Sequence, residues 1–268
     1  MVTGNGQRET GIIRPWADAP LAGGAPLEGR RADAGEIRLT GRDVRGLLWC
    51  GQMYGVRADH LAALLGASAD VVRQVHARWR RAGLAATGRL GPGPGWCWLT
   101  RAGLEACGLP YEPKRPPLAR LAHVHAVSVA RLAFERWDVW PGAAAWWRSE
   151  RHLRWLRGAG VGQRGHVPDG EIIWPDGGHR YAGQVWCVEV ELTPKTVART
   201  AGIMAGLLAR TCDLGAEDER WGSGGPRYAR VVYLAAPAAR ATVERARASL
   251  ADRAAWRVEV RDLPAGAL

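Results

Sequence analysis

Residues 171–192 read EIIWPDGGHRYAGQVWCVEVEL. Two apolar runs, 171–174 and 181–192, flank the turn-forming segment PDGGHR, a pattern typical of a β-hairpin. Asp169 precedes the first expected strand, and Glu189 lies near the end of the second. Because the start of one antiparallel strand meets the end of its partner, we expect Asp169 and Glu189 to approach each other at one edge of a sheet.

Glu191 adds a third carboxylate to this expected cluster. It follows Glu189 by two residues, so the period-two alternation of a strand places both glutamates on one face. Asp176 also belongs to a Pro-Asp-Gly motif, but it lies in the hairpin turn. At ~3.3 Å per residue, that turn is about 26 Å from Glu189. The carboxylates expected to converge are therefore Asp169, Glu189 and Glu191.

Carboxylates clustered in this way repel one another unless a cation neutralises them. Hard oxygen ligands favour Mg²⁺ or Mn²⁺, which can activate water beside a phosphodiester. We therefore expect Asp169, Glu189 and Glu191 to be metal ligands and catalytic residues in nucleic-acid cleavage. Alternatively, Asp169 caps a turn and the glutamates line an exposed strand face. Glu135 and Glu150 are each candidates for a further carboxylate or for a surface salt bridge.

Lys195 is the fourth candidate catalytic residue, because only two of the 37 basic residues are lysines. Thr193 and Pro194 suit the cap and first position of a helix, which predicts Lys195 in the first turn. Arg199 follows one turn later on the same side. Since a helix N-terminus attracts phosphate, we expect both basic side chains to hold the phosphate of the cleaved bond or to orient the attacking water.

Three histidines of this half are candidates for a role in the site: His123, His125 and His166. His123 and His125 form a His-hydrophobic-His motif, which binds metal when both rings lie on one side of a strand. Residues 118–137 instead have helical periodicity, which turns residues i and i+2 about 200° apart. The motif is therefore rejected as a metal site. His166 is expected either to contact substrate or to form a hydrogen bond within its loop.

The remainder of this half alternates helices and strands. The helix 118–137 is followed by a strand within AAAWWRSER, the hairpin, a helix, a strand, a second helix and the final strand WRVEV. The predicted order is α, β, β, β, α, β, α, β. Such an order indicates an α/β (α+β) fold, in which a mixed sheet is flanked by helices.

Residues 36–110 have the pattern of a small helical unit. Three helices are expected, at 40–54, 57–66 and 71–84. Gly66 suits the left-handed residue that ends the second helix, and Ser68 suits the cap of the third. The segments AATGRL and GWCWLT then flank GPGP, which predicts a hairpin, and TRAGLEACG predicts a short closing helix. Together these elements indicate a winged helix-turn-helix.

The third of these helices is expected to contact DNA. Its apolar side is formed by Val72, Val75 and Trp79, and its other side is basic. Residues 36–110 hold ten arginines and five acidic residues. Arginine to guanine and glutamine to adenine are the bidentate contacts of a helix in the major groove. The expected DNA-binding residues of the helix and hairpin are Arg73, Gln74, Arg78, Arg80, Arg81 and Arg89. A protein-binding winged helix is the alternative.

Composition restricts the class of protein. The 268 residues include 37 basic and 26 acidic residues, a net charge of +11, and such an excess attracts polyanions. The five cysteines form no Cys-x-x-Cys pair, which argues against a zinc ribbon or a disulfide framework. No apolar run reaches ~18 residues and no signal peptide is recognised. We therefore expect a cytoplasmic protein without membrane contact.

The chain is expected to contain two domains. The glycine-rich segment 1–35 is predicted to be a disordered tail. Residues 111–117 lie within LPYEPKRPPL, whose four prolines interrupt the helical patterns on both sides and predict a linker. The DNA-binding domain is expected at 36–110 and the carboxylate-bearing domain at 118–268.

Several of these segments resemble one family. HVPDGEIIW, WCVEVELTPKT with Arg199, and RYARVVYLAAP are similar to the replication-relaxation family of plasmids and integrated elements. The resemblance covers roughly 37–262 and includes the LLG-x-S turn and WLTRAG. It implies a role in the replication and relaxation of plasmid DNA. More distantly, Asp169, Glu189 and Glu191 resemble the site of the PD-(D/E)xK nucleases, which implies a restriction-endonuclease-like fold. Glu191 stands where those enzymes usually have lysine.

Three functions remain open from the sequence. The first is a Mg²⁺- or Mn²⁺-dependent endonuclease that nicks or cleaves double-stranded DNA. The second is a non-catalytic replication initiator or transcription regulator that uses the nuclease-like fold as a platform. The third is a structural partner of other replication or conjugation proteins, without affinity for DNA. A homodimer is compatible with each.

Overall fold

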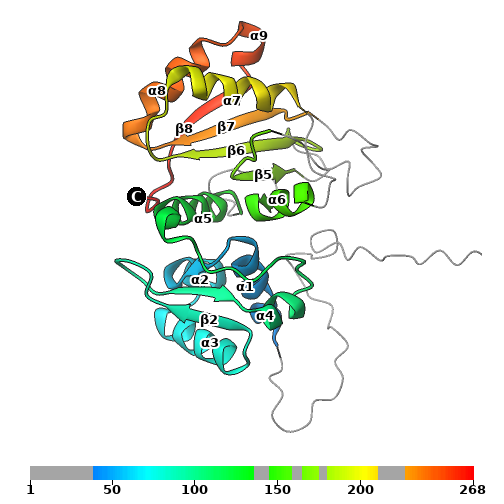
Figure 1. Ribbon diagram of the computed structural model, residues 1–268, viewed down its shortest axis with the longest axis vertical. Coiled ribbons are helices and arrows are strands. Elements are labelled where there is room, and N and C mark those ends of the chain that lie inside the picture. Colours follow the sequence, from blue (N-terminus) through cyan, green and yellow to red (C-terminus); the bar gives the residue numbers. More distant parts are fainter. Residues whose placement is uncertain (1–38, 136–144, 159–164, 175–179, 211–226) are drawn as a thin grey trace, which may run out of the picture.

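The computed structural model describes residues 39–135, 145–158, 165–174, 180–210 and 227–268 (Figure 1). The expected tail 1–35 and the turn residue Asp176 lie outside the described residues. In the described parts, no helix is long and apolar enough to cross a membrane.

Three helices open the described chain. They are α1 (Gly41–Gln52), α2 (Ala58–Leu65) and α3 (Ala69–Arg81). Thr40 and Asp43 form a reciprocal capping box at the start of α1. Gly66 ends α2 with a φ of 57°, and the Ser68 side chain accepts a hydrogen bond from the Val71 amide at the start of α3. The predictions for these two positions are confirmed.

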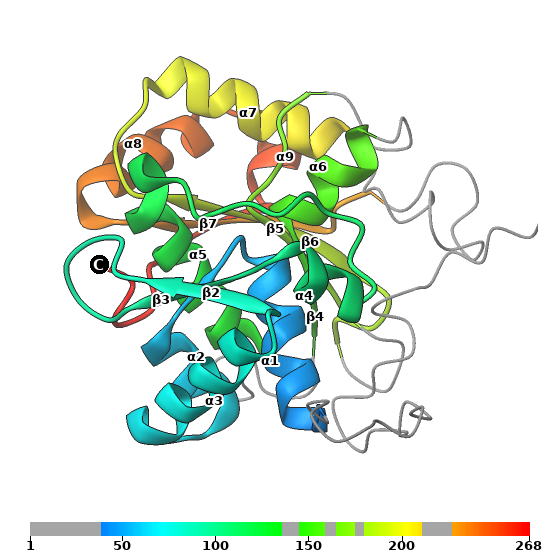
Figure 2. The same cartoon turned by 60° about the horizontal axis from the view of Figure 1, so that its bottom comes forward.

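A small antiparallel sheet follows the helices. Its strands are β1 (Val56–Arg57), β2 (Ala85–Gly88) and β3 (Trp96–Leu99), in the spatial order β1-β3-β2. The predicted hairpin is therefore present, and β2 and β3 extend beside α3 (Figure 2). The short helix α4 (Arg101–Ala106) closes this half and is capped by Thr100.

A five-stranded mixed sheet dominates the other half. Its helices are η1 (Leu118–Arg120), α5 (Leu121–Glu135), α6 (Glu150–Gly158), α7 (Val197–Ala209), α8 (Pro237–Ala248) and α9 (Asp252–Ala255). Its strands are β4 (Trp146–Ser149), β5 (Gly170–Ile173), β6 (Val185–Glu191), β7 (Arg230–Ala235) and β8 (Val258–Asp262). The spatial order is β4-β5-β6-β7-β8. The first three strands are antiparallel neighbours, and β6, β7 and β8 are parallel.

This arrangement confirms the mixed sheet flanked by helices and corrects two details. The strand predicted within AAAWWRSER ends at Ser149, and the sequence from Glu150 forms α6, which is absent from the predicted order. The prediction that Lys195 lies in the first turn of a helix is wrong: Thr196 caps α7, which begins at Val197. Lys195 therefore belongs to the connection between β6 and α7.

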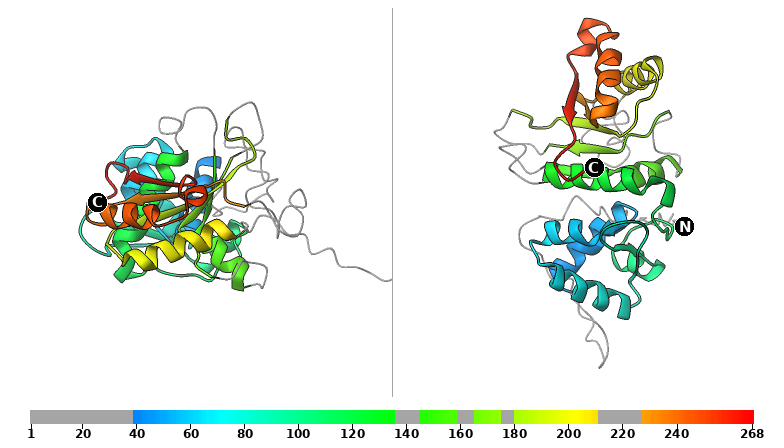
Figure 3. Two further views of the ribbon diagram at one scale, coloured as in Figure 1. Left: turned by 90° about the horizontal axis from the view of Figure 1, so that it is seen from above. Right: turned by 90° about the vertical axis from the view of Figure 1, so that its left-hand side faces the viewer.

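Helices cover both faces of the large sheet. On one side, which we call the α7 face, Val185 and Cys187 pack with Met204 and Leu207 of α7. On the other, the α5 face, the alternate residues of β6 pack towards α5. In Figures 1 and 3, α5 lies between the sheet and the N-terminal helices. Glu189 shares the side of Cys187 by strand alternation, so it belongs to the α7 face.

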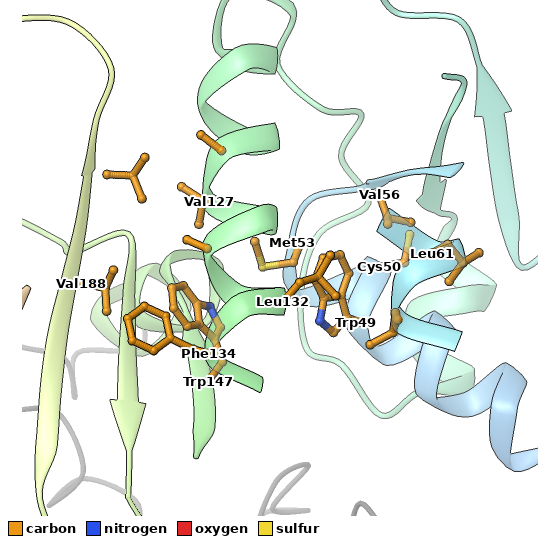
Figure 4. Packing of buried hydrophobic residues seen from close by; sticks show 14 of the residues in the cluster. Trp49, Cys50, Met53, Val56, Leu61, Val127, Leu132, Phe134, Trp147 and Val188 are labelled. Atoms are coloured by element: carbon orange, nitrogen blue, oxygen red, sulfur yellow. The ribbon is translucent and has the colours of Figure 1, made fainter. Parts of the chain in front are cut away.

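The two halves share one hydrophobic cluster. It runs from Val188 of the sheet through Val127 and Leu132 of α5 to Trp49 and Leu61 (Figure 4). Polar contacts reinforce this boundary, since Arg151 donates hydrogen bonds to the carbonyl oxygens of Gly51 and Glu112 at 2.6 and 2.5 Å. The expected linker 111–117 is part of this packing: Tyr111 and Pro116 are buried.

Candidate functional site

The site is built around the paired ends of β5 and β6. Gly170 is the register partner of Val188, so Asp169 and Glu189 are brought together one residue further along, as predicted. Gly170 is required by packing, because a Cβ atom there would lie 2.2 Å from the Trp147 ring. In the Pro-Asp-Gly sequence, Asp169 therefore directly precedes the glycine at which β5 packs closely against Trp147 of β4.

Asp169 is buried and held from two directions. Its Oδ2 accepts a hydrogen bond from the Val190 amide at 2.8 Å, and its Oδ1 lies 2.8 Å from Nε2 of His123 on α5. Burial raises the pKa of a carboxyl, but the hydrogen bond and charge of His123 outweigh burial and lower the pKa of Asp169. The same contact raises the pKa of His123 against its own burial. Asp169 is thus kept ionised.

Glu189 has the opposite electrostatic character. Burial and then the negative charge of Asp169 raise its pKa to about 7, although the hydrogen bond from His166 opposes them. Both carboxylate oxygens lie near Nε2 of His166, at 2.9 and 3.0 Å. That hydrogen bond also raises the pKa of His166. Glu189 and His166 therefore form a hydrogen-bonded pair in which the pKa of each member is raised.

Glu191 completes the set, which we call the acidic site: Asp169, Glu189 and Glu191. Its Oε2 forms an ion pair with Nζ of Lys195 in the β6–α7 connection. The side chains of Lys195 and His166 are 31% and 37% exposed, whereas the glutamates beneath them are almost wholly buried. Two basic groups therefore form the rim over an acidic floor.

Glu150, one of the two candidates for a further carboxylate, adjoins the acidic site together with Arg120 and Arg154. The Glu150 amide donates to the Asp169 carbonyl oxygen at 3.3 Å, and the Glu150 side chain pairs with both arginines. Glu150 is thus beside the site but is neutralised by arginine. Glu135 lies elsewhere, paired with Arg131. Glu150–Arg154 and Arg131–Glu135 are i,i+4 pairs that helical spacing predicts, whereas no local pattern signals the contacts of Glu150 with Arg120 and Asp169.

The two histidines of the His-hydrophobic-His motif diverge, as the helical prediction requires. His123 faces Asp169, whereas His125 lies 2.6 Å from His60 of α2, Nδ1 to Nε2. The rejection of this motif as a single metal site is therefore consistent with the geometry. His123 alone, without His125, adjoins the acidic site, a contact that the sequence does not predict.

The oxygen donors of the acidic site suit a hard divalent cation in kind. Each carboxylate, however, already faces a basic side chain: His123, His166 or Lys195. Within the described ranges, no group of three or more His, Cys, Asp or Glu side chains is arranged to hold a metal ion. Binding a cation at Glu189 and Glu191 requires the partly exposed rim groups to move aside.

The basic side of α3 is open to solvent. Arg73, Gln74, Arg80 and Arg81 are exposed there, and Arg89 is exposed in the loop after β2. Figures 1 and 3 place α3 at the end of the molecule opposite α8. The structure thus presents five of the six expected DNA-contacting residues of this half on accessible surface.

Arg78, the sixth expected residue, is only partly exposed, with 36% of its side chain accessible. Its guanidinium forms an ion pair with the fully buried carboxylate of Asp43. The neighbouring Trp79 donates to the same carboxylate at 2.8 Å. Arg78 therefore fastens α3 to α1, because a buried carboxylate needs its cationic partner.

Arg199 lies in the first turn of α7 and is exposed. Its backbone amide donates to the Thr196 cap, while its side chain forms no ion pair with another described residue. It is separated from Lys195 by only four residues. Among the residues that the structure describes, Arg199 therefore offers an unpaired guanidinium four positions after Lys195 in the chain.

Comparison with known proteins adds no relative to this geometry. No family model matches the chain, and no curated protein or solved structure matches it either.

Proposed function

We propose that this chain is a DNA-binding protein of the replication-relaxation type that nicks or cleaves DNA with a divalent cation. The observation that carries the proposal is the convergence of Asp169 and Glu189, from two strands, beneath a basic rim. A buried acid pair with one low and one raised pKa is characteristic of sites that do chemistry.

DNA binding is supported by α3 and the hairpin. The exposed arginines and Gln74 are chemically suited to phosphates and base edges in a major groove. The adjacent Arg89 extends the basic surface onto the hairpin loop. A helix followed by a hairpin at one end of the molecule supports the winged helix-turn-helix interpretation.

Catalysis is assigned to the acidic site. Asp169, Glu189 and Glu191 would hold Mg²⁺ or Mn²⁺, which supplies Lewis-acid polarisation of a phosphodiester and a more acidic water. His166 can accept or return a proton at Nε2, since its pKa is raised beside Glu189. Lys195 and Arg199 would orient the phosphate from the rim. The positive charges of Lys195 and Arg199 would also reduce the repulsion between the DNA backbone and the carboxylates of the acidic site.

A second candidate is a replication initiator or regulator without catalysis. The ion pairs Glu191–Lys195 and His166–Glu189 favour it, because they neutralise the acidic site without metal. In that case the sheet serves as a platform, and only α3 and the hairpin contact DNA.

Supercoiled plasmid DNA separates the two candidates. The purified protein is incubated with plasmid carrying the origin of the parent element, in Mg²⁺, Mn²⁺ or EDTA. Conversion to open-circular or linear DNA only with metal is the expected result. Tight binding with intact plasmid in both metals would leave the platform function, and absence of binding would exclude both.

A further inference from the structure

A group of basic residues lies on the α5 face, at the opposite end of the sheet from the acidic site. Strand β8 alternates Val258, Glu259, Val260 and Arg261. The valines pack into the cluster with α7 and α8, so Glu259 and Arg261 belong to the α5 face, where both are partly exposed. This part of the α5 face is therefore polar and open.

A hollow of about 330 Å³ occupies this region. Its walls contain three arginines and one acidic residue, with aromatic rings beneath them. The lining includes Arg180, Arg230, Arg261, Tyr181, Trp186 and Glu259. The walls thus carry an excess of positive charge, in keeping with an anionic ligand.

The aromatic rings hold two of the guanidinium groups in place. Arg180 lies over Tyr181 at 4.5 Å from the ring centroid, and Arg230 lies over Trp186 at 5.8 Å. The two rings are themselves buried and pack edge to face, 4.7 Å apart. Stacking occupies the flat side of a guanidinium and leaves its N–H edge free for a ligand.

Carboxylates do not occupy these N–H edges. Glu259 is bonded to Arg261. Neither Arg180 nor Arg230 forms an ion pair with any of the described residues. Two stacked guanidiniums without counterions, facing one hollow, match the bidentate recognition of a phosphate group.

We propose that this hollow binds a phosphate group of a nucleic-acid strand. The proposal rests on the DNA-binding function proposed above and adds a second contact surface to it. Trp186 and Glu189 are three residues apart on β6, about 10 Å along the strand, but they belong to opposite faces. The phosphate site is therefore separate from the acidic site and lies at the other end of the sheet.

The test is equilibrium binding of fluorescent oligonucleotides to the full chain. A single strand and a duplex of the same sequence are titrated with wild type and with Arg180→Gln/Arg230→Gln at several salt concentrations. We expect about tenfold weaker binding of one of the two forms. Its log–log salt slope should decrease by about 0.7 per lost contact for a single strand, or 0.9 for a duplex. Inorganic phosphate as competitor distinguishes a free anion from the strand.

Two controls keep the outcome decisive. Arg245→Gln/Arg253→Gln removes the same charge from exposed positions of α8 and α9 and should leave affinity unchanged. Arg180→Lys/Arg230→Lys retains charge and the aliphatic stems, so it should fold while losing the bidentate fork and part of the affinity. An effect equal to that of the control pair, or no effect at all, overturns the phosphate site. Loss of binding in α3 variants alone would still support the proposed function.

Discussion

Asp169 and Glu189 are neighbouring buried carboxyls whose pKa values are displaced in opposite directions. Burial acts on both, but His123 compensates it at Asp169, whereas Asp169 itself adds negative charge beside Glu189. A cation would reverse the shift at Glu189, because it favours the ionised carboxylate. Isosteric substitution can therefore remove the charge of either carboxylate while keeping the shape of its side chain.

Asp169→Asn and Glu189→Gln should each abolish metal-dependent nicking. Each change keeps the shape of the side chain and removes a charge that holds the cation, so the rate should fall by at least about 100-fold. Binding of DNA through α3 should remain within about twofold. Plasmid nicking and oligonucleotide binding are measured on the same preparations.

The matched control is Glu244→Gln, an equivalent change on the exposed side of α8. It should nick as wild type does. Equal nicking by Asp169→Asn and wild type would place the activity elsewhere in the protein.

Lys195→Arg tests whether the lysine positions one oxygen or only contributes charge. Arginine keeps the charge but replaces a compact ammonium with a wide planar fork. We expect nicking to fall by about tenfold or more while the salt dependence of DNA binding stays the same. Lys114→Arg, at an exposed position of the linker, is the control, and it should be neutral. Full activity of Lys195→Arg would show that Lys195 contributes only its positive charge and does not position an oxygen.

At the scale of elements, α3 is attached to α1 through one buried carboxylate. Asp43 belongs to the capping box of α1 and also receives hydrogen bonds from Arg78 and Trp79. These bonds fix which side of α3 faces inward. The outward side then presents Arg73, Gln74, Arg80 and Arg81 to solvent.

The triple variant Arg73→Ala/Arg80→Ala/Arg81→Ala should weaken DNA binding and flatten its salt dependence. Each lost phosphate contact should reduce the log–log salt slope by about 0.9. The folded state should persist, because all three side chains are exposed. Measurements on duplex DNA between low and physiological salt test this directly.

A variant with three exposed arginines of α8 and α9 changed to alanine is the matched control. The residues are Arg245, Arg247 and Arg253. It has the same net charge as the α3 variant, so general electrostatics predicts equal losses for the two. Equal losses would mean that α3 is not the element that reads DNA.

At the scale of the whole molecule, the two halves are joined by one core and by buried polar contacts across it. The rings of His60 and His125 are stacked at 4.8 Å between α2 and α5. Burial lowers the pKa of His60 to about 3 and also lowers the pKa of His125. Burial therefore favours the neutral form of both rings in the folded protein, and protonating them opposes the contact between the halves.

Stability should consequently decrease in mild acid. The pKa of a histidine in the unfolded chain is about 6.5, whereas the pKa of His60 in the folded protein is about 3. Between these values the unfolded chain binds a proton at His60 and the folded protein does not, so acid favours unfolding. Through His60, the free energy of unfolding should be about 2 kcal/mol lower at pH 5 than at pH 7. Denaturant unfolding of wild type and His60→Gln at pH 7, 6 and 5 measures it.

The variant should lose less stability than wild type over that interval, even if it is less stable at pH 7. His123→Gln serves as contrast, because the pKa of His123 is raised in the folded state. Protonated His123 stabilises the folded state below pH 6.5, so its removal should steepen the loss in acid. Parallel curves for wild type and His60→Gln would contradict the role of the histidine pair.

The sequence by itself determined the features that depend on near neighbours. Gly66 and Ser68 act within one turn of a helix, and the alternation of Val-Glu-Val-Glu assigns Glu189 and Glu191 to one face wherever the strand lies. Antiparallel pairing then places Asp169 opposite Glu189. Local backbone geometry and a period of two residues are sufficient for each of these inferences.

Only the tertiary structure decided which charges meet. His123 reaches Asp169 across 46 residues and Arg78 reaches Asp43 across 35, because α5 packs on the sheet and α3 on α1. No periodicity encodes such pairs. Packing between residues far apart in the sequence also joins the two halves through one hydrophobic cluster, since the apolar side of α5 is buried against both halves.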